Sequence, residues 1–233
     1  MLLDAIFLLE RDPLLAVVTL ITFTVCLVIA ITVHEASHAL AATTLGDHTA
    51  RNQGRLSLNP KVHLDPLGAA LIMFAGFGWG KPTPVNPARL RLQGPSGMAV
   101  VSLAGPVSNI VTAIVFAVPL RAGVVDTRVL GFSSLGDLTH LPAYVLVSLV
   151  FWNLLLAAFN LLPIAPLDGF KFLLGILPPG AARNVAQLEQ YGPGILVLII
   201  MLDYMLPGPG ILASLLGPVL NVLSFAVLGR DLL

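Results

Sequence analysis

Residues 14–45 read LLAVVTLITFTVCLVIAITVHEASHALAATTL. A helix needs roughly 20 apolar residues to cross a bilayer. This run of about 30 exceeds that length, so we expect it to tilt or to project from one face of the membrane. Pro13 suits the first turn of a helix and Gly46 suits its end. The stretch therefore predicts one long membrane-spanning helix.

Three polar side chains lie in the second half of this run: His34, Glu35 and His38. Four residues apart on a helix, the two imidazoles share one face, which is the geometry for two nitrogen ligands of one metal ion. Glu35 points partly aside, so it can reach a metal-bound water without binding the ion. This H-E-x-x-H spacing is typical of zinc hydrolases. The alternative is a chance match of satisfied polar residues in a bundle, and the cost of charges in lipid argues against it.

The composition indicates an integral membrane protein, so one partner of the chain is the lipid bilayer. Hydrophobic residues make up 57% of the 233 residues and charged residues only 10%, whereas a soluble domain has about 25% charged residues. The formal net charge is zero, which suggests no nucleic-acid partner. The single cysteine, Cys26, lies in an apolar run and excludes a disulfide framework.

Further apolar segments predict an all-α polytopic protein with about five transmembrane helices. After 14–45 they cover 97–120, 141–162, 192–206 and 211–229. We expect one domain over 1–233, with a core of about 14–176 and additional C-terminal helices over about 192–229. No internal repeat is visible.

The segments between the first two spans do not read as further crossings. Residues 67–80, LGAALIMFAGFGWG, are apolar but too short to span, which favours a re-entrant segment. In the polar residues 46–67, RLSLN alternates and predicts a small β-rich loop near the membrane surface. Residues 81–95, KPTPVNPARLRLQGP, predict an extended surface loop that can supply an edge strand.

The basic residues predict the orientation, provided that 67–80 does not cross. Nine then share one side and three the other. The larger group is Arg51, Arg55, Lys61, Lys81, Arg89, Arg91, Lys171, Arg183 and Arg230, and the smaller is Arg11, Arg121 and Arg128. This excess predicts a multi-pass protein of the cell membrane, with its site within the membrane toward the cytoplasmic side.

A catalytic zinc ion takes three protein ligands and keeps one open position. Asp168 is the preferred third ligand, because Pro163 and Pro166 interrupt the preceding helix and can aim it inward. It also reaches a depth similar to that of the two histidines. The alternative is an exposed aspartate that caps the next helix. Other candidates are the remaining aspartates and His48, His63 and His140.

Three motifs together carry a family resemblance: HEASH at 34–38, AGPVSN at 104–109 and NLLPIAPLDG at 160–169. In this order they resemble the site-2 protease family of intramembrane zinc metalloproteases, over about residues 30–169. Residues 46–68 and 78–87 are also similar to the compact bacterial and archaeal members. The chain shows neither the PDZ nor the CBS domain of other members, nor the helix that usually precedes HExxH.

The resemblance implies one zinc ion per chain, with His34, His38 and Asp168 as ligands and Glu35 as the catalytic residue. It implies an endopeptidase that hydrolyses peptide bonds in or near transmembrane segments, in regulated intramembrane proteolysis. The substrate partner is then a membrane-protein helix. A helix must unwind before attack, and the 81–88 loop and the re-entrant segment are candidate strand partners for it.

Two asparagines at membrane depth, Asn109 and Asn160, have two open interpretations. They bind the substrate backbone or the oxyanion, or they make helix–helix hydrogen bonds. Alternatives for the whole protein are a non-hydrolytic zinc-binding sensor or adaptor, and a transporter, although no repeated broken helices support the latter. The natural substrate and the oligomeric state stay open.

Overall fold

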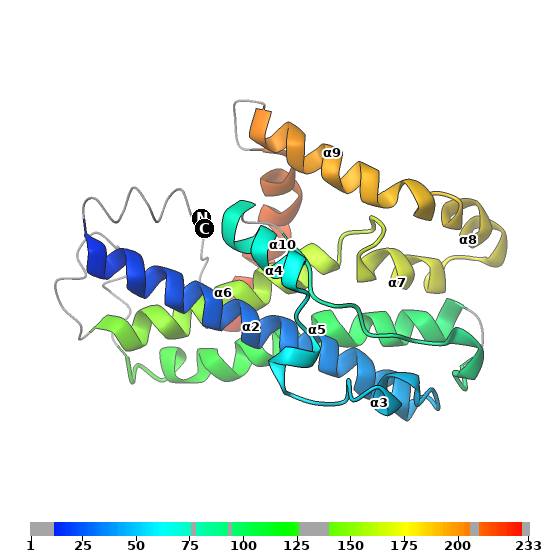
Figure 1. Ribbon diagram of the computed structural model, residues 1–233. Helices are drawn as coiled ribbons and strands as arrows, with labels where there is room; N and C mark the ends of the chain where they lie inside the picture. Colours follow the sequence, from blue (N-terminus) through cyan, green and yellow to red (C-terminus); the bar gives the residue numbers. More distant parts are fainter. Residues whose placement is uncertain (1–11, 76–77, 93–94, 126–139, 206–209, 230–233) are drawn as a thin grey trace.

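The computed structural model describes residues 12–75, 78–92, 95–125, 140–205 and 210–229 (Figure 1). Within these residues, five helical stretches are long and apolar enough to cross a membrane: Pro13–Thr44, Pro95–Arg121, Leu141–Asn160, Pro179–Asp203 and Ile211–Leu228. The prediction of a helical, multi-pass protein with about five membrane-spanning helices is confirmed to this extent.

The long N-terminal helix, α2 (Pro13–Thr44), begins and ends where its sequence indicates. Asp12 caps it, because its carboxylate accepts a hydrogen bond of 3.0 Å from the Leu15 N–H. At the other end, Gly46 has a φ of 102°, a conformation that favours glycine. The helix predicted over 14–45 is therefore present.

Three helices form the centre of the molecule: α2, α5 (Pro95–Arg121) and α6 (Leu141–Asn160), which run side by side in Figure 1. Their shared surfaces contain small buried residues, including Ala30 and Ala39 of α2, Ala113 of α5 and Ala157 of α6. Small residues allow helix backbones to approach closely where lipid removes the hydrophobic driving force between helices.

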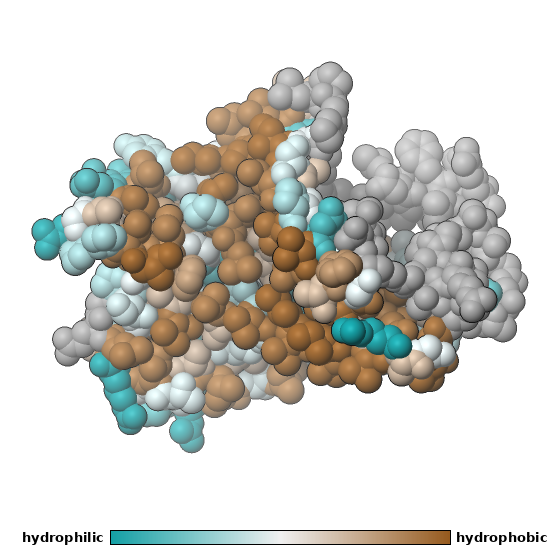
Figure 2. Space-filling view, turned by 180° about the vertical axis from the view of Figure 1, so that it is seen from behind, coloured by the Kyte–Doolittle hydropathy of each residue, from teal (hydrophilic) through white to brown (hydrophobic). Residues whose placement is uncertain are grey.

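Large apolar side chains cover the outside of the bundle. Val115 and Val118 of α5 are 60% exposed, and Val222 of α10 (Ile211–Leu228) is 70% exposed. Figure 2 shows hydrophobic residues over most of the coloured middle of one face. Such exposure is unfavourable in water and expected against acyl chains.

The fourth candidate span is not one continuous helix. It comprises α8 (Pro179–Ala186), a 3₁₀ turn at Glu189–Tyr191 and α9 (Gly192–Met205). The 14 residues of α9 rise about 21 Å, less than the bilayer core of about 30 Å. Asp203, near the end of α9, accepts hydrogen bonds from the main-chain N–H groups of Ile211 and Leu212 and so caps α10.

The prediction of a β-rich loop over 46–67 is wrong. This part of the chain contains α3 (Thr49–Asn52) and a 3₁₀ turn at Pro60–Val62, and the described residues contain no strand. One isolated bridge joins Leu64 to Gly80. The alternation in RLSLN does not place its leucines inside, because Leu56 is 40% and Leu58 72% exposed. Arg55 is the buried residue, and its guanidinium donates to the main-chain oxygens of Val62 and Pro82.

The apolar segment that follows contains α4 (Pro66–Ala75), and residues 76–77 lie outside the described part. Ten residues rise about 15 Å, so α4 does not cross a bilayer. The re-entrant interpretation stays a prediction. In the next loop, 81–92 has a 3₁₀ turn at Pro87–Arg89 and no edge strand.

Candidate functional site

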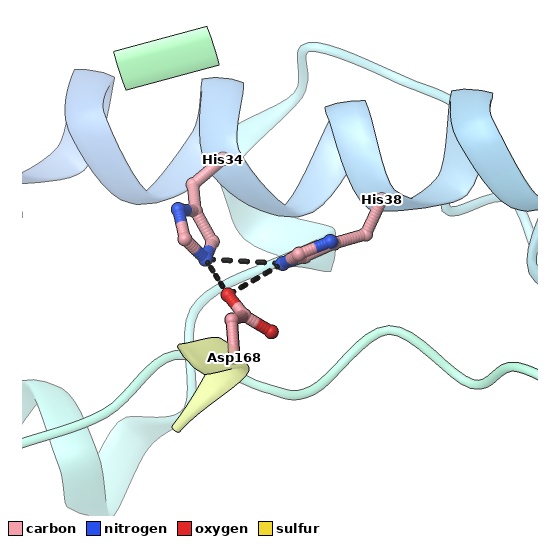
Figure 3. Close-up of side chains that lie close together, drawn as sticks. All are labelled: His34, His38 and Asp168. Atoms are coloured by element: carbon pink, nitrogen blue, oxygen red, sulfur yellow. Dashed lines mark hydrogen bonds and ion pairs between the residues drawn. The ribbon is translucent and has the colours of Figure 1, made fainter. Parts of the chain in front are cut away.

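Two histidines of α2 and one aspartate from a distant part of the chain converge on one point (Figure 3). His34 Nε2 lies 3.1 Å from His38 Nε2, and Asp168 Oδ2 lies 3.0 Å from the first nitrogen and 3.1 Å from the second. The histidines are 5% and 7% exposed. Among the described residues, these three form the group of His, Cys, Asp and Glu side chains that could hold a metal ion.

The turn between α6 and α7 (Asp168–Ile176) delivers Asp168 to the histidines. Helix α6 ends at Asn160, and Pro163 and Pro166 lie in the turn that follows. The break in the helix that these two prolines predicted is therefore present. Gly169 allows the turn to close, since a Cβ there would lie 2.3 Å from the Leu161 carbonyl oxygen. Asp168 is the first residue of α7 and points toward α2.

Hydrogen bonds on the far side of each imidazole fix which nitrogen is free. The Nδ1–H of His38 donates to the Val101 carbonyl oxygen at 2.8 Å, and that of His34 donates to Asn109 Oδ1 at 2.7 Å. A carbonyl oxygen can only accept, so each neutral imidazole carries its proton on Nδ1. Both Nε2 atoms therefore present lone pairs to the point of convergence.

The amide of Asn109 is itself oriented by two acceptors. Its Nδ2 donates to the Ala30 carbonyl oxygen at 3.0 Å and to Asn153 Oδ1 at 2.9 Å, and Asn153 Nδ2 donates to the Leu149 carbonyl oxygen at 2.8 Å. Both asparagines are completely buried. The relay leaves Asn109 Oδ1 directed at His34, which supports the assignment of the His34 tautomer.

The arrangement of the three donor atoms favours a bound cation. Two imidazole lone pairs and an oxygen of the Asp168 carboxylate face one another within 3.1 Å, and they repel one another unless a cation lies between them. The spacing fits zinc, because tetrahedral ligands about 2.0–2.1 Å from the ion lie roughly 3.3 Å apart.

Gly105 of the AGPVSN segment lies directly against this group. A Cβ at position 105 would lie 2.5 Å from His38 Nε2 and 2.6 Å from His34 Cε1. Gly105 therefore packs directly against the pair of imidazoles. Only a residue without a side chain leaves both rings in their positions.

A cavity of about 770 Å³ opens beside the three donor atoms. Its lining is mainly apolar, with Phe23 and Ile31 from α2, Trp152 from α6, Leu196 from α9 and Leu216 from α10. His34, Glu35, His38 and Asp168 also line it. The donor group therefore has an open side, as a catalytic metal site requires.

Glu35 lines the cavity but is not one of the three converging groups. Its Oε2 accepts hydrogen bonds from the Thr83 N–H at 2.9 Å and from the Thr83 hydroxyl at 2.7 Å. This placement agrees with a carboxylate beside, and not on, a metal ion.

The two other asparagine candidates are placed differently from each other. Asn109 is buried behind His34 and does not line the cavity, whereas Asn160 does. Asn160 Nδ2 donates to the Leu156 carbonyl oxygen of its own helix at 3.0 Å. Of these two asparagines, Asn160 is therefore the one that can reach a molecule in the cavity.

The remaining histidines lie away from the donor group. His48 precedes α3, and His140 precedes α6. His63 is buried, and its Nε2 donates to the Ser57 carbonyl oxygen at 2.7 Å. None of the three joins the group of possible ligands in the described residues.

Two residues that support the site were not among the candidates from the sequence. Asn153 orients Asn109 behind His34, and Thr83 contacts Glu35. The membrane depth of Asn153 was the only signal for it. Thr83 lies 48 positions from Glu35, so no local spacing could indicate their contact.

Comparison with known proteins identifies relatives over most of the chain. The protein named "Putative zinc metalloprotease YwhC" from Bacillus subtilis (strain 168) is 41% identical over 170 residues, 72% of this chain and 74% of that protein. "Putative zinc metalloprotease Rip2" is 31% identical over 171 residues in Mycolicibacterium smegmatis and 28% identical over 177 residues in Mycobacterium tuberculosis (strain H37Rv). No protein-family model and no solved structure matches the chain.

The share of each chain that these matches cover shows to which family the protein belongs. The match to Rip2 covers 72% and 74% of this chain but 62% and 64% of the two Rip2 proteins, so the chain spans less than two thirds of their length. The match to YwhC covers about three quarters of both chains. By this relationship, the chain belongs to the zinc metalloprotease family that includes YwhC.

Proposed function

We propose that this protein is an intramembrane zinc endopeptidase of the site-2 protease type, with one zinc ion per chain bound by His34, His38 and Asp168. The observation that carries the proposal is the convergence of three electron-pair donors beside a largely apolar cavity between membrane helices. Family membership supports the metal and the reaction class.

In this proposal the residues of the chain divide the chemistry. Zinc, when bound, supplies Lewis-acid activation of water and of the scissile carbonyl. Glu35 takes a proton from the attacking water and passes it to the leaving amine. Asn160 lines the cavity and is the candidate to bind the substrate backbone or the developing oxyanion. The Nδ1 hydrogen bonds of the two histidines keep their Nε2 lone pairs directed at the ion.

The proposed substrate is a membrane-spanning helix that unwinds locally. The apolar lining from α2, α6, α9 and α10 suits the side chains of such a helix. The excess of basic residues on one side supports a site within the cell membrane toward the cytoplasm. In this setting the reaction is a step of regulated intramembrane proteolysis.

The decisive experiment compares the native protein, Glu35→Gln and Asp168→Asn after reconstitution with a membrane-spanning model peptide. We expect Glu35→Gln to retain zinc and lose cleavage by at least about 100-fold, within the range for general acid–base catalysis. Asp168→Asn should lose zinc and cleavage together. Equal cleavage by the native protein and Glu35→Gln would refute the mechanism. Zinc binding without any cleavage would favour the sensor or adaptor.

A further inference from the structure

The loop of residues 81–86 brings an additional side chain to Glu35. Thr83 donates its main-chain N–H to Glu35 Oε2 at 2.9 Å and directs its hydroxyl at the same oxygen, 2.7 Å away. The hydroxyl also lies 3.0 Å from the main-chain oxygen of Glu35. It has one proton, so it donates to one of these acceptors at a time. One residue thus supplies both donors to a single carboxylate oxygen.

The neighbours of Thr83 explain why its N–H is the one that reaches Glu35. Pro82 and Pro84 have no N–H. Thr83 therefore has the only main-chain donor in 82–84, and Glu35 accepts from it. A substrate strand alongside 82–84 would find no free N–H there.

Contacts that do not involve Glu35 hold the loop on both sides of Thr83. Before it, the Lys81 N–H donates to the His63 carbonyl oxygen at 2.7 Å, and the Arg55 guanidinium donates to the Pro82 carbonyl oxygen at 2.9 Å. After it, the Asn86 N–H donates to Asp47 Oδ2 at 2.6 Å. Arg55 and Asp47 are buried. The loop around Thr83 is therefore also held by contacts that are independent of Glu35.

The result is a difference between the two oxygens of the Glu35 carboxylate. Oε2 accepts from Thr83, whereas no described residue donates a hydrogen bond to Oε1. Glu35 lines the cavity beside the three donor atoms. A carboxylate fixed through one oxygen presents the other in a defined direction, whereas a freely rotating one does not.

We propose that Thr83 is the positioning residue for Glu35, and that loop 81–86 serves the general base through it. This inference rests on the proposed function. When the water O–H bond breaks, its proton goes to Oε1 while Thr83 keeps both of its protons on the Oε2 side. The proton then moves from Oε1 to the nitrogen of the leaving amine, and the carboxylate is restored.

The test measures kcat and KM separately for Thr83→Val, Thr83→Ala and Thr83→Ser, with the same reconstituted peptide. Thr83→Val and Thr83→Ala lose the hydroxyl but keep the N–H, so we expect kcat to fall about 10-fold, part of the 10²–10⁴ of a general base. KM and zinc content should stay within about twofold of native, and Thr83→Ser should recover most of kcat. Thr112→Val is the matched control, because that hydroxyl bonds only its own helix, to Ser108 O at 2.8 Å.

Two kinetic results would overturn the positioning role. One is native kcat in Thr83→Val and Thr83→Ala, and the other is a raised KM with unchanged kcat, which would place the loop against the substrate. Loss of cleavage in Glu35→Gln separates this failure from failure of the proposed function. A structure of Thr83→Ala provides a readout without substrate: Glu35 should occupy more than one conformer, and a single native conformer would also refute the role.

Discussion

The cavity has two unlike sides. On the polar side, formed by α2, α5 and α7, the histidines and Glu35 are fixed by hydrogen bonds to buried or anchored partners. On the apolar side, formed by α9 and α10, Ile200, Leu212 and Leu216 line the cavity, and the Asp203 carboxylate accepts from the first turn of α10. Hydrogen bonds give the polar side one defined geometry. Apolar contacts have no preferred direction, so the apolar side can adapt to different substrate side chains. Substitutions on the two sides should therefore change different measurable quantities.

The largest effect should come from adding one methyl group on the polar side, in Gly105→Ala. The new Cβ would lie 2.5 Å from His38 Nε2, and the imidazoles cannot move aside without breaking their Nδ1 hydrogen bonds. We expect zinc content at background and cleavage lowered by at least about 100-fold.

Gly217→Ala is the matched control on the apolar side. It lies in the interior of α10, where a Cβ would have nothing within 4 Å. Native zinc content and cleavage are expected. If Gly105→Ala also bound zinc normally, the close packing of α5 against the imidazoles would not matter for the metal.

The second effect tests the relay behind His34. Asn109→Leu removes the acceptor for the His34 Nδ1–H and leaves Asn153 Oδ1 without its donor. Loss of such an outer partner typically weakens metal binding by about 10–100-fold. Competition with a zinc chelator measures this affinity without any substrate.

Asn109→Asp keeps an acceptor oxygen toward His34, so it should retain more zinc affinity than Asn109→Leu. Asn221→Leu on α10 is the control, because its side chain is exposed. His38 offers no equivalent experiment, since its acceptor is the main-chain oxygen of Val101. Equal zinc affinity in Asn109→Leu and the native protein would contradict the relay.

The third effect belongs to the apolar side. Ile200→Ala enlarges the cavity at a partly buried position on α9. We expect KM for a membrane-spanning peptide to rise roughly threefold to tenfold, the range for losing apolar contacts worth about 1 kcal/mol. Zinc affinity should be unchanged. A drop in zinc content would show that the two sides are not independent.

Local patterns in the sequence predicted one part of this arrangement well. The i, i+4 spacing of His34 and His38 determines their common face as soon as a helix forms, and length and apolarity predicted that helix. Pro163 and Pro166 predicted the break before Asp168 because proline removes helical hydrogen bonds wherever it occurs. These features depend on residues within a few positions of one another.

The rest depends on contacts between distant segments. Thr83 reaches Glu35, and Asn109 reaches His34 across 75 positions, so spacing along the chain gives no sign of either. The same limitation explains the wrong β-rich loop. Arg55 is buried with hydrogen bonds to the main-chain oxygens of Val62 and Pro82, whereas Leu56 and Leu58 are exposed. An alternating pattern alone does not show which of its side chains lie inside.

The smallest expected effect concerns the anchor of loop 81–86 at Asp47. Burial alone raises the pKa of Asp47, but hydrogen bonds from Thr49 and Asn86 outweigh burial and bring that pKa below its usual range. A lowered folded-state pKa means that the contribution to stability is complete above the unfolded pKa of about 3.9 and is lost as pH falls through the folded value.

We therefore expect Asp47→Asn to be less stable than the native protein at pH 7, and this difference to shrink below about pH 4. Thermal unfolding at pH 7, 5 and 3 measures it, and the native value should change little between pH 7 and 5 on account of this group. Because Asn86 then loses a charged acceptor and Thr83 lies three residues away, kcat should fall slightly while zinc affinity stays native. A difference that grows toward pH 3 would show that Asp47 is not an ionised anchor, and would leave Arg55 as the residue that fixes the loop.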